Sequence, residues 1–226
     1  MSRDIMLLIG QSNMAGRGLL NEVDPIADGR IETFRYNQWQ AAVEPLHNDK
    51  ETAGVGLSMS CASAYLEAFT QARVGLVPAA VGGTPLSRWM PGEDLYERAL
   101  GIAREALKGG ALKAILWHQG ETDAQHLELA QSYGQRLAEM VDTLRQALDA
   151  TDVPFVAGGL GDFLAVHPTC VHYGLVNNAL QNLNVDRCGF ASAEGLGEFD
   201  SIHFNSAALR LLGQRYATEL LRLVRA

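Results

Sequence analysis

The stretch that decides the fold is Ile5-Met6-Leu7-Leu8-Ile9, followed directly by Gly10-Gln11-Ser12-Asn13-Met14. Five consecutive apolar residues predict a strand that is covered on both faces, because a half-exposed strand would alternate between apolar and polar side chains. An apolar run that ends in Gly-x-Ser presents a hydroxyl at the carboxyl edge of a sheet. We therefore predict a site at this edge, with Ser12 as its candidate nucleophile.

Further short apolar runs alternate with helical patterns along the chain, which is typical of a sheet with crossover helices. In each predicted helix, apolar residues recur at intervals of three and four. The sequence thus predicts an α/β fold, with strands at 5–9, 73–79, 112–117, 154–158 and 189–193 and one more possible strand at 31–35. Helices are predicted at 57–71, 95–108, 127–150, 169–182 and 206–224.

Polar or glycine-rich segments follow four of the predicted strands. Because ligands of such folds bind beyond the carboxyl ends of the strands, these four segments are expected to converge on one site. They are 10–14, 80–84 (Ala-Val-Gly-Gly-Thr), 118–123 (His-Gln-Gly-Glu-Thr-Asp) and the loop that ends in Asp200 and His203.

Asp200 and His203 are three residues apart, so both can lie on one turn and reach the same hydroxyl. With Ser12 they supply a nucleophile, a general base and an orienting carboxylate, and triads are defined by roles in space whatever their order in the chain. The alternative is that Asp200 caps the following helix and His203 is a surface residue. Met14 stands where Gly-x-Ser-x-Gly has its last glycine, which disfavours an α/β-hydrolase elbow.

Two further segments offer hydrogen-bond donors for an oxyanion. Glycines at 82 and 83 let backbone N–H groups approach a ligand closely, although a plain turn is the alternative. Gln119 offers a side-chain amide. Glu121 is interpreted as a second carboxylate on His203, a substrate partner or a structural acceptor.

No metal ion and no cofactor are predicted. The candidate ligands lack a helical H-E-x-x-H pattern; they are His118, Glu121, Asp123 and His126. The cysteines form no C-x-x-C pair and are expected to be buried free thiols; they are Cys61, Cys170 and Cys188.

The charge and the length of the chain limit the functions that it can have. The chain has 226 residues and a formal net charge of −8 without a run of Lys or Arg, which argues against nucleic acid and anionic membranes as partners. We expect a single domain over 1–226. No run reaches about 18 apolar residues, and the first apolar run is too short for a signal peptide, so a cytoplasmic location is expected.

Taken together, the motifs resemble the SGNH hydrolase superfamily and, within it, the sialate O-acetylesterase-like group that includes carbohydrate esterase family six. The string Gln-Gly-Glu-Ser/Thr-Asp is more diagnostic of this branch than the generic Ser…Asp-x-x-His. The matching strings occur in the family's order and span almost the whole chain: Gly10-Gln-Ser-Asn-Met-Ala-Gly16, Ala80-Val-Gly-Gly-Thr84, Trp117-His-Gln-Gly-Glu-Thr-Asp123 and Asp200-Ser-Ile-His203.

The resemblance implies a flavodoxin-like, three-layer α/β/α sandwich with a parallel sheet of about five strands. It implies a cofactor-free serine esterase that removes O-acetyl groups from sugars, with Ser12 as nucleophile, His203 as base and Asp200 as its partner. The short chain favours small acetylated sugars or oligosaccharides as substrates.

The resemblance also implies an oxyanion hole made of the Ser12 N–H, the Gly83 N–H and the Gln119 side chain. Gly82 replaces Gly83 if the register of the loop differs by one. Glu121 corresponds to a glutamate that some relatives use as an additional acid partner of the histidine.

Two other functions stay open at this point. One is a lipid or thioester hydrolase on the same scaffold, which needs an apolar tunnel for a long acyl chain. The other is a non-catalytic carbohydrate-binding module, against which the complete set of Ser12, Asp200 and His203 argues. Trp89 is a candidate sugar-stacking wall or a packed core aromatic. Specificity is expected in the segments 16–51, 85–92 and 163–172.

Overall fold

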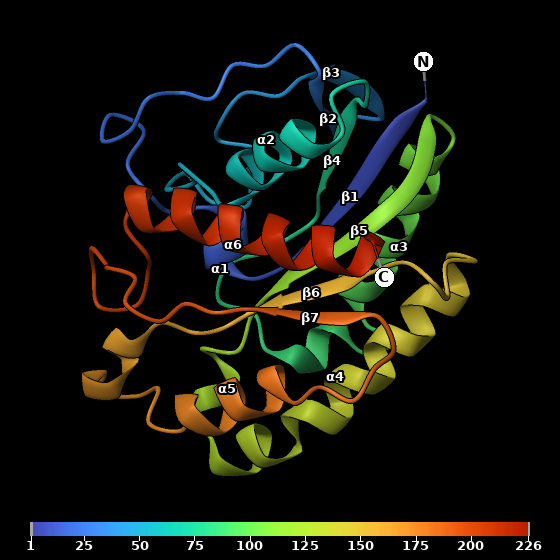
Figure 1. Cartoon of the computed structure of the whole chain (residues 1–226). Helices are drawn as coiled ribbons and strands as arrows, with labels where there is room; N and C mark the ends of the chain where they lie inside the picture. Colours follow the sequence, from blue (N-terminus) through green and yellow to red (C-terminus); the bar gives the residue numbers. More distant parts are fainter. Residues whose placement is uncertain (1, 226) are drawn as a thin grey trace.

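Seven strands form one sheet in the order β3-β2-β4-β1-β5-β6-β7 in the computed structural model, which describes residues 2–225 (Figure 1). All neighbouring strands run parallel except β3, which pairs antiparallel with β2 at one edge. The strands are β1 (Arg3–Gly10), β2 (Ile31–Arg35), β3 (Gln38–Ala41), β4 (Val74–Pro78), β5 (Gly110–His118), β6 (Phe155–Gly158) and β7 (Cys188–Ala191).

Helices cover both faces of the sheet, with α2 and α6 on one face and α3, α4 and α5 on the other (Figure 1). The helices are α1 (Ser12–Ala15), α2 (Ser58–Ala68), α3 (Asp94–Leu107), α4 (Leu127–Ala147), α5 (Tyr173–Gln181) and α6 (Ser206–Arg225). Short 3-10 turns follow β4, β5 and β6; they are η1 (Leu86–Trp89), η2 (Asp123–Gln125) and η3 (Asp162–Val166). The predicted α/β sandwich with a mostly parallel sheet is confirmed. Among the helices of residues 2–225, none has the length and apolar character needed to cross a membrane.

The sheet has two more strands than the roughly five that the resemblance implied. β2 matches the possible strand at 31–35, whereas β3 was not predicted. β3 has no apolar run, because an edge strand exposes most of its residues. Its pairing depends on a two-residue turn in which Tyr36 and Asn37 both have positive φ, of 51° and 58°.

β1 links the two halves of the core because its side chains alternate between the faces. Ile5, Leu7 and Ile9 pack with α3, α4 and α5, whereas Met6 and Leu8 pack with α2 and α6. This explains why the run 5–9 is continuously apolar. Burial of such side chains stabilises the fold by about 25 cal/mol for each Å² of apolar surface.

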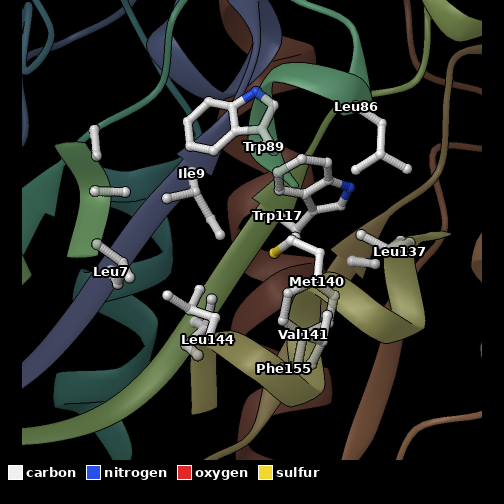
Figure 2. Packing of buried hydrophobic residues seen from close by; sticks show 14 of the residues in the cluster. Leu7, Ile9, Leu86, Trp89, Trp117, Leu137, Met140, Val141, Leu144 and Phe155 are labelled. Atoms are coloured by element: carbon white, nitrogen blue, oxygen red, sulfur yellow. The ribbon is translucent and has the colours of Figure 1, made fainter. Parts of the chain in front are cut away.

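Trp89 belongs to this core and not to a sugar-binding wall. Figure 2 shows it against Trp117, among residues of β1 and α4. The two indoles make an edge-to-face contact with centroids 5.6 Å apart, and Trp89 is 1% exposed. Its indole N–H donates to Thr84 Oγ1 (3.2 Å), so the polar end of the ring is satisfied inside the protein.

The cysteines are free thiols, as expected. Cys61 and Cys170 are buried, whereas Cys188 is only partly buried.

The close packing of α6 on α2 requires a glycine at position 213. A Cβ there would lie 2.1 Å from the Leu57 carbonyl oxygen, which is backbone and does not move aside easily. We expect Gly213→Ala to lower the free energy of unfolding by about 3 kcal/mol, as measured by urea denaturation. Gly101→Ala on α3 is the matched control, because a Cβ there meets nothing within 4 Å. That variant should be neutral or stabilised by up to about 1 kcal/mol, and equal losses in both variants would contradict the packing argument.

Candidate active site

Three of the four predicted polar segments meet where β1 ends. Gly10 has a φ of 128°, and a Cβ there would lie 2.2 Å from the His118 carbonyl oxygen, so only glycine fits beside β5. The Gln11 N–H donates to the same oxygen (2.8 Å), and α1 begins with the next residue, Ser12. The loop after β4 comes to this place as well, because a Cβ at Gly82 would lie 3.4 Å from Ser12 Cβ.

Asn13 brings the fourth segment to the same place. Its side-chain Oδ1 accepts the N–H of Phe204 (3.1 Å), and its Nδ2 donates to the carbonyl of Ile202 (3.2 Å). These two residues flank His203. The loop that carries the imidazole is therefore fastened to the residue that follows Ser12, although almost the whole chain lies between them.

Asp200 and His203 form a hydrogen-bonded pair, with 2.6 Å between Asp200 Oδ2 and His203 Nδ1. The other oxygen of Asp200 accepts the backbone N–H groups of His203 (2.8 Å) and Ile202 (3.2 Å). Burial alone would raise the pKa of Asp200, but these hydrogen bonds outweigh it and hold the pKa below the ordinary 3.8. Asp200 thus stays a carboxylate, and its hydrogen bond to Nδ1 holds the ring of His203.

The alternative of Asp200 as a helix cap is wrong. α6 begins at Ser206, and the side-chain oxygen of Asn205 accepts the N–H of Ala208 (2.9 Å). Asn205 is therefore the residue that caps this helix. His203 is partly buried, and Phe199 stacks on its ring at 6.1 Å between centroids.

The hydrogen bonds of the structure distinguish between the two glycines that were candidates for the oxyanion hole. The Gly82 N–H donates to Asp49 Oδ2 (2.7 Å), so it has no proton left for a ligand. Asp49 is held in turn by Arg17 at 2.6 Å. The Gly83 N–H has no acceptor among the described residues, and its φ of 74° is readily adopted by glycine. This geometry favours Gly83 over Gly82.

Gln119 differs from the prediction that its side chain donates to an oxyanion. Both protons of its Nε2 are used, one by the Thr84 carbonyl (3.0 Å) and one by Asp123 Oδ2 (2.7 Å). Its Oε1 accepts the hydroxyl of Tyr133 (2.8 Å). In this arrangement the Gln119 side chain joins β5 to the glycine loop after β4 and has no N–H left for a substrate.

Glu121 is fully buried behind the site. Its Oε1 accepts Asn13 Nδ2 (2.5 Å), and its Oε2 has no partner among the described residues. Its hydrogen bond is therefore to Asn13 and not to His203. Burial raises the pKa of Glu121 to about 7, and the hydrogen bond from Asn13 only partly opposes this.

The positioning roles of three residues were not identified from the sequence. Asn13 lies inside the Gly10–Gly16 string, but its partners are about 190 residues away and only the folded chain reveals them. Asp49 lies in the irregular segment 16–51, where no pattern marks it. Asp123 was weighed only as a metal ligand, yet it is a buried acceptor for Gln119 and forms an ion pair with Arg136 (2.9 Å).

The family model described as "Carbohydrate esterase, sialic acid-specific acetylesterase" matches residues 2–222. The chain belongs to this family. It is a carboxylic ester hydrolase, and the resemblance seen in the sequence is confirmed. A probable carbohydrate esterase of Arabidopsis thaliana is 32% identical, over 92% of this chain and 86% of that protein. A solved structure of an Arabidopsis thaliana protein has a TM-score of 0.90 at 30% identity and covers 98% of this chain and 99% of its own.

More distant structures share the esterase family's fold. NanS has a TM-score of 0.82 at 19% identity, over 99% of this chain and 98% of its own. A carbohydrate acetylesterase from Xanthomonas citri has a TM-score of 0.74 at 21% identity, over 98% of this chain and 56% of its own. At these identities the likeness concerns the fold alone.

The raised pKa of Glu121 predicts a dependence of stability on pH. The folded value of about 7 lies above the ordinary 4.5, so the folded chain binds this proton more tightly. The resulting stabilisation is complete below pH 4.5 and is lost as the pH rises through 7. Glu121→Gln should remove this loss, which is on the order of 3 kcal/mol between pH 5 and 8, in urea denaturation. The exposed Glu139→Gln serves as control, and the idea fails if Glu121→Gln keeps the wild-type pH profile.

The hydrogen bonds from Asn13 to the residues on either side of His203 predict that losing Asn13 lowers turnover. A variant with a similar loss of stability should not show this decrease. Asn13→Ala should lower kcat about 10- to 100-fold, because the loop that carries His203 loses its position, and leave KM nearly unchanged. The control Asn177→Ala removes an amide that also makes two backbone hydrogen bonds, both to Leu160. Both variants should lose about 2 kcal/mol of stability, but kcat should fall in Asn13→Ala alone. Equal kcat values in the two variants would contradict the positioning role.

Proposed function

We propose that this chain removes O-acetyl groups from acetylated carbohydrates, with Ser12 as nucleophile, His203 as general base and Asp200 as its orienting partner. The observation that carries the proposal is the Asp200–His203 pair, whose loop is hydrogen-bonded through Ile202 and Phe204 to Asn13, the residue after Ser12. The nucleophile then comes from α1, and the base and its orienting carboxylate both come from the loop between β7 and α6. The family match and the name of the Arabidopsis relative support the choice of an acetylated carbohydrate as substrate.

In the acylation step, Ser12 Oγ attacks the acetyl carbonyl carbon and its proton passes to His203 Nε2. The tetrahedral intermediate carries its negative charge on the former carbonyl oxygen. When it collapses, the bond to the sugar oxygen breaks and His203 returns the proton to that oxygen. The sugar leaves with a hydroxyl, and the acetyl group stays on Ser12.

In the deacylation step, water takes the place of the sugar. His203 takes a proton from the water, whose oxygen attacks the acetyl carbon. Ser12 Oγ then leaves with the proton from His203, and acetate is released. Asp200 stabilises the imidazolium that forms in both steps without taking its proton.

The oxyanion is proposed to lie between the N–H groups of Ser12 and Gly83. Both belong to backbone at the start of a helix or in a glycine turn, so they are oriented before substrate arrives. Gln119 contributes indirectly, because it holds the Thr84 carbonyl and so fixes the turn that presents Gly83. Glu121 is proposed to act on His203 through Asn13.

A lipid or thioester hydrolase is the second candidate, and one observation favours it. The cleft beside His203 is lined in part by apolar side chains that are exposed to solvent, namely Leu19, Leu20 and Phe199. Acyl-chain preference separates the two candidates. An acetylesterase hydrolyses p-nitrophenyl acetate faster than the octanoate, and the reverse order supports the lipid hydrolase.

The proposal predicts that hydrolysis of p-nitrophenyl acetate depends on Ser12. Ser12→Ala should lower kcat by about 10⁴- to 10⁶-fold, because the nucleophile is gone and only the oxyanion donors and substrate binding remain. Ser132→Ala on α4 is the control, since this hydroxyl bonds only within its own helix. The proposal is wrong if the wild-type chain does not hydrolyse p-nitrophenyl acetate, or if Ser12→Ala hydrolyses it equally fast. Either result would favour a binding module.

A further inference from the structure

A cleft of about 700 Å³ opens beside His203. One wall is formed by 199–200 and His203, and the other by 17–21 and 51–54. Asp200 and His203 both line this cleft.

Under the proposed function, on which this inference rests, the leaving sugar has to lie beside His203. His203 must return its proton to the sugar oxygen as the ester bond breaks, so that oxygen has to come within hydrogen-bonding distance of the imidazole. The rest of the sugar then extends into the cleft that His203 lines. The charge of this space therefore decides which sugars are accepted.

The side chains that line the cleft leave it without an available positive charge. Arg17 is its one guanidinium, but Arg17 is paired with Asp49 at 2.6 Å, and the two side chains are only 4% and 2% exposed. Three of its hydrogen bonds are made inside the protein, two to the carboxylate of Asp49 and one to the Gly16 carbonyl. Its charge is thus neutralised before a substrate arrives.

Negative charge, in contrast, is present on both walls. Asp200 is a carboxylate with a lowered pKa, and Glu51 on the opposite wall is exposed and forms no ion pair among the described residues. Lys50 precedes Glu51 in the chain but does not line the cleft. The net charge of −8 adds an overall repulsion of anions.

We propose that the cleft binds the leaving group of an uncharged acetylated sugar and discriminates against sugars that carry a carboxylate, such as sialates. Asn21 and Thr52 supply polar partners for sugar hydroxyls, and Leu19 and Phe199 supply apolar contacts for the C–H faces of the ring. A ligand carboxylate would find two like charges and no free cation here. This member of the family therefore differs from the sialic acid specificity that the family's description names.

The test compares an O-acetylated sialic acid with its methyl ester, two substrates that differ by one negative charge. The methyl ester should be deacetylated with a kcat/KM about tenfold higher at low salt, and the ratio should shrink as salt screens the repulsion. Glu51→Gln should raise kcat/KM for the free acid and so bring the ratio of the two kcat/KM values closer to one. Glu67→Gln, an exposed carboxylate on α2, should leave the ratio unchanged.

A kcat/KM for the free acid that equals or exceeds that for the methyl ester overturns the proposal, as does a ratio that Glu51→Gln leaves unaltered. p-Nitrophenyl acetate keeps this result separate from the proposed function. If that ester is hydrolysed in a Ser12-dependent manner while the free acid is preferred, the charge argument alone fails. If that ester is not hydrolysed at all, the proposed esterase mechanism itself fails.

Discussion

One side chain, the amide of Asn13, holds the site together. An amide offers an acceptor and two donor protons, so it can satisfy a backbone N–H and a carbonyl on either side of His203 and still bind Glu121. The hydrogen bonds to Glu121 and Phe204 are buried, and the one to Ile202 is partly buried. Because a buried polar group without a partner is costly, separating the loop from Asn13 would cost free energy. The consequence is that α1 and the loop of His203 behave as one unit. The position of the imidazole relative to Ser12 follows from this constraint and not from local turn geometry alone.

A second buried polar contact, the ion pair between Asp49 and Arg17, lies near Ser12. The carboxylate of Asp49 accepts hydrogen bonds from the Gly82 N–H and from the guanidinium of Arg17. Arg17 lies two residues after the end of α1. A buried ion pair adds little net stability, but the loss of one partner leaves an uncompensated charge, so the pair is strongly retained once formed. The pair fixes which glycine of the loop after β4 keeps its N–H free, and it also removes the one guanidinium charge from the cleft. Oxyanion geometry and substrate charge preference are thus linked through the same two residues.

The sequence predicts the scaffold well and indicates candidate reacting groups, because both depend on local patterns. The run from Ile5 to Ile9 marks the central strand, and the polar segments after four strands meet as expected once those strands lie parallel. The rest depends on contacts between distant segments. β3 has no apolar run, because it is an exposed edge. Gln119 was assigned as an oxyanion donor, since nothing near it in sequence shows that Thr84 and Asp123 take both its protons.

The most direct test of the account is covalent labelling with a fluorophosphonate, which reacts with a serine only when a base activates its hydroxyl. Peptide mass spectrometry should locate one adduct, on Ser12, in the wild-type chain. The adduct should be lost in His203→Ala, while urea denaturation shows that this variant is still folded. An adduct on another residue, or equally rapid labelling of Ser12 in His203→Ala, would contradict the claim that His203 activates Ser12.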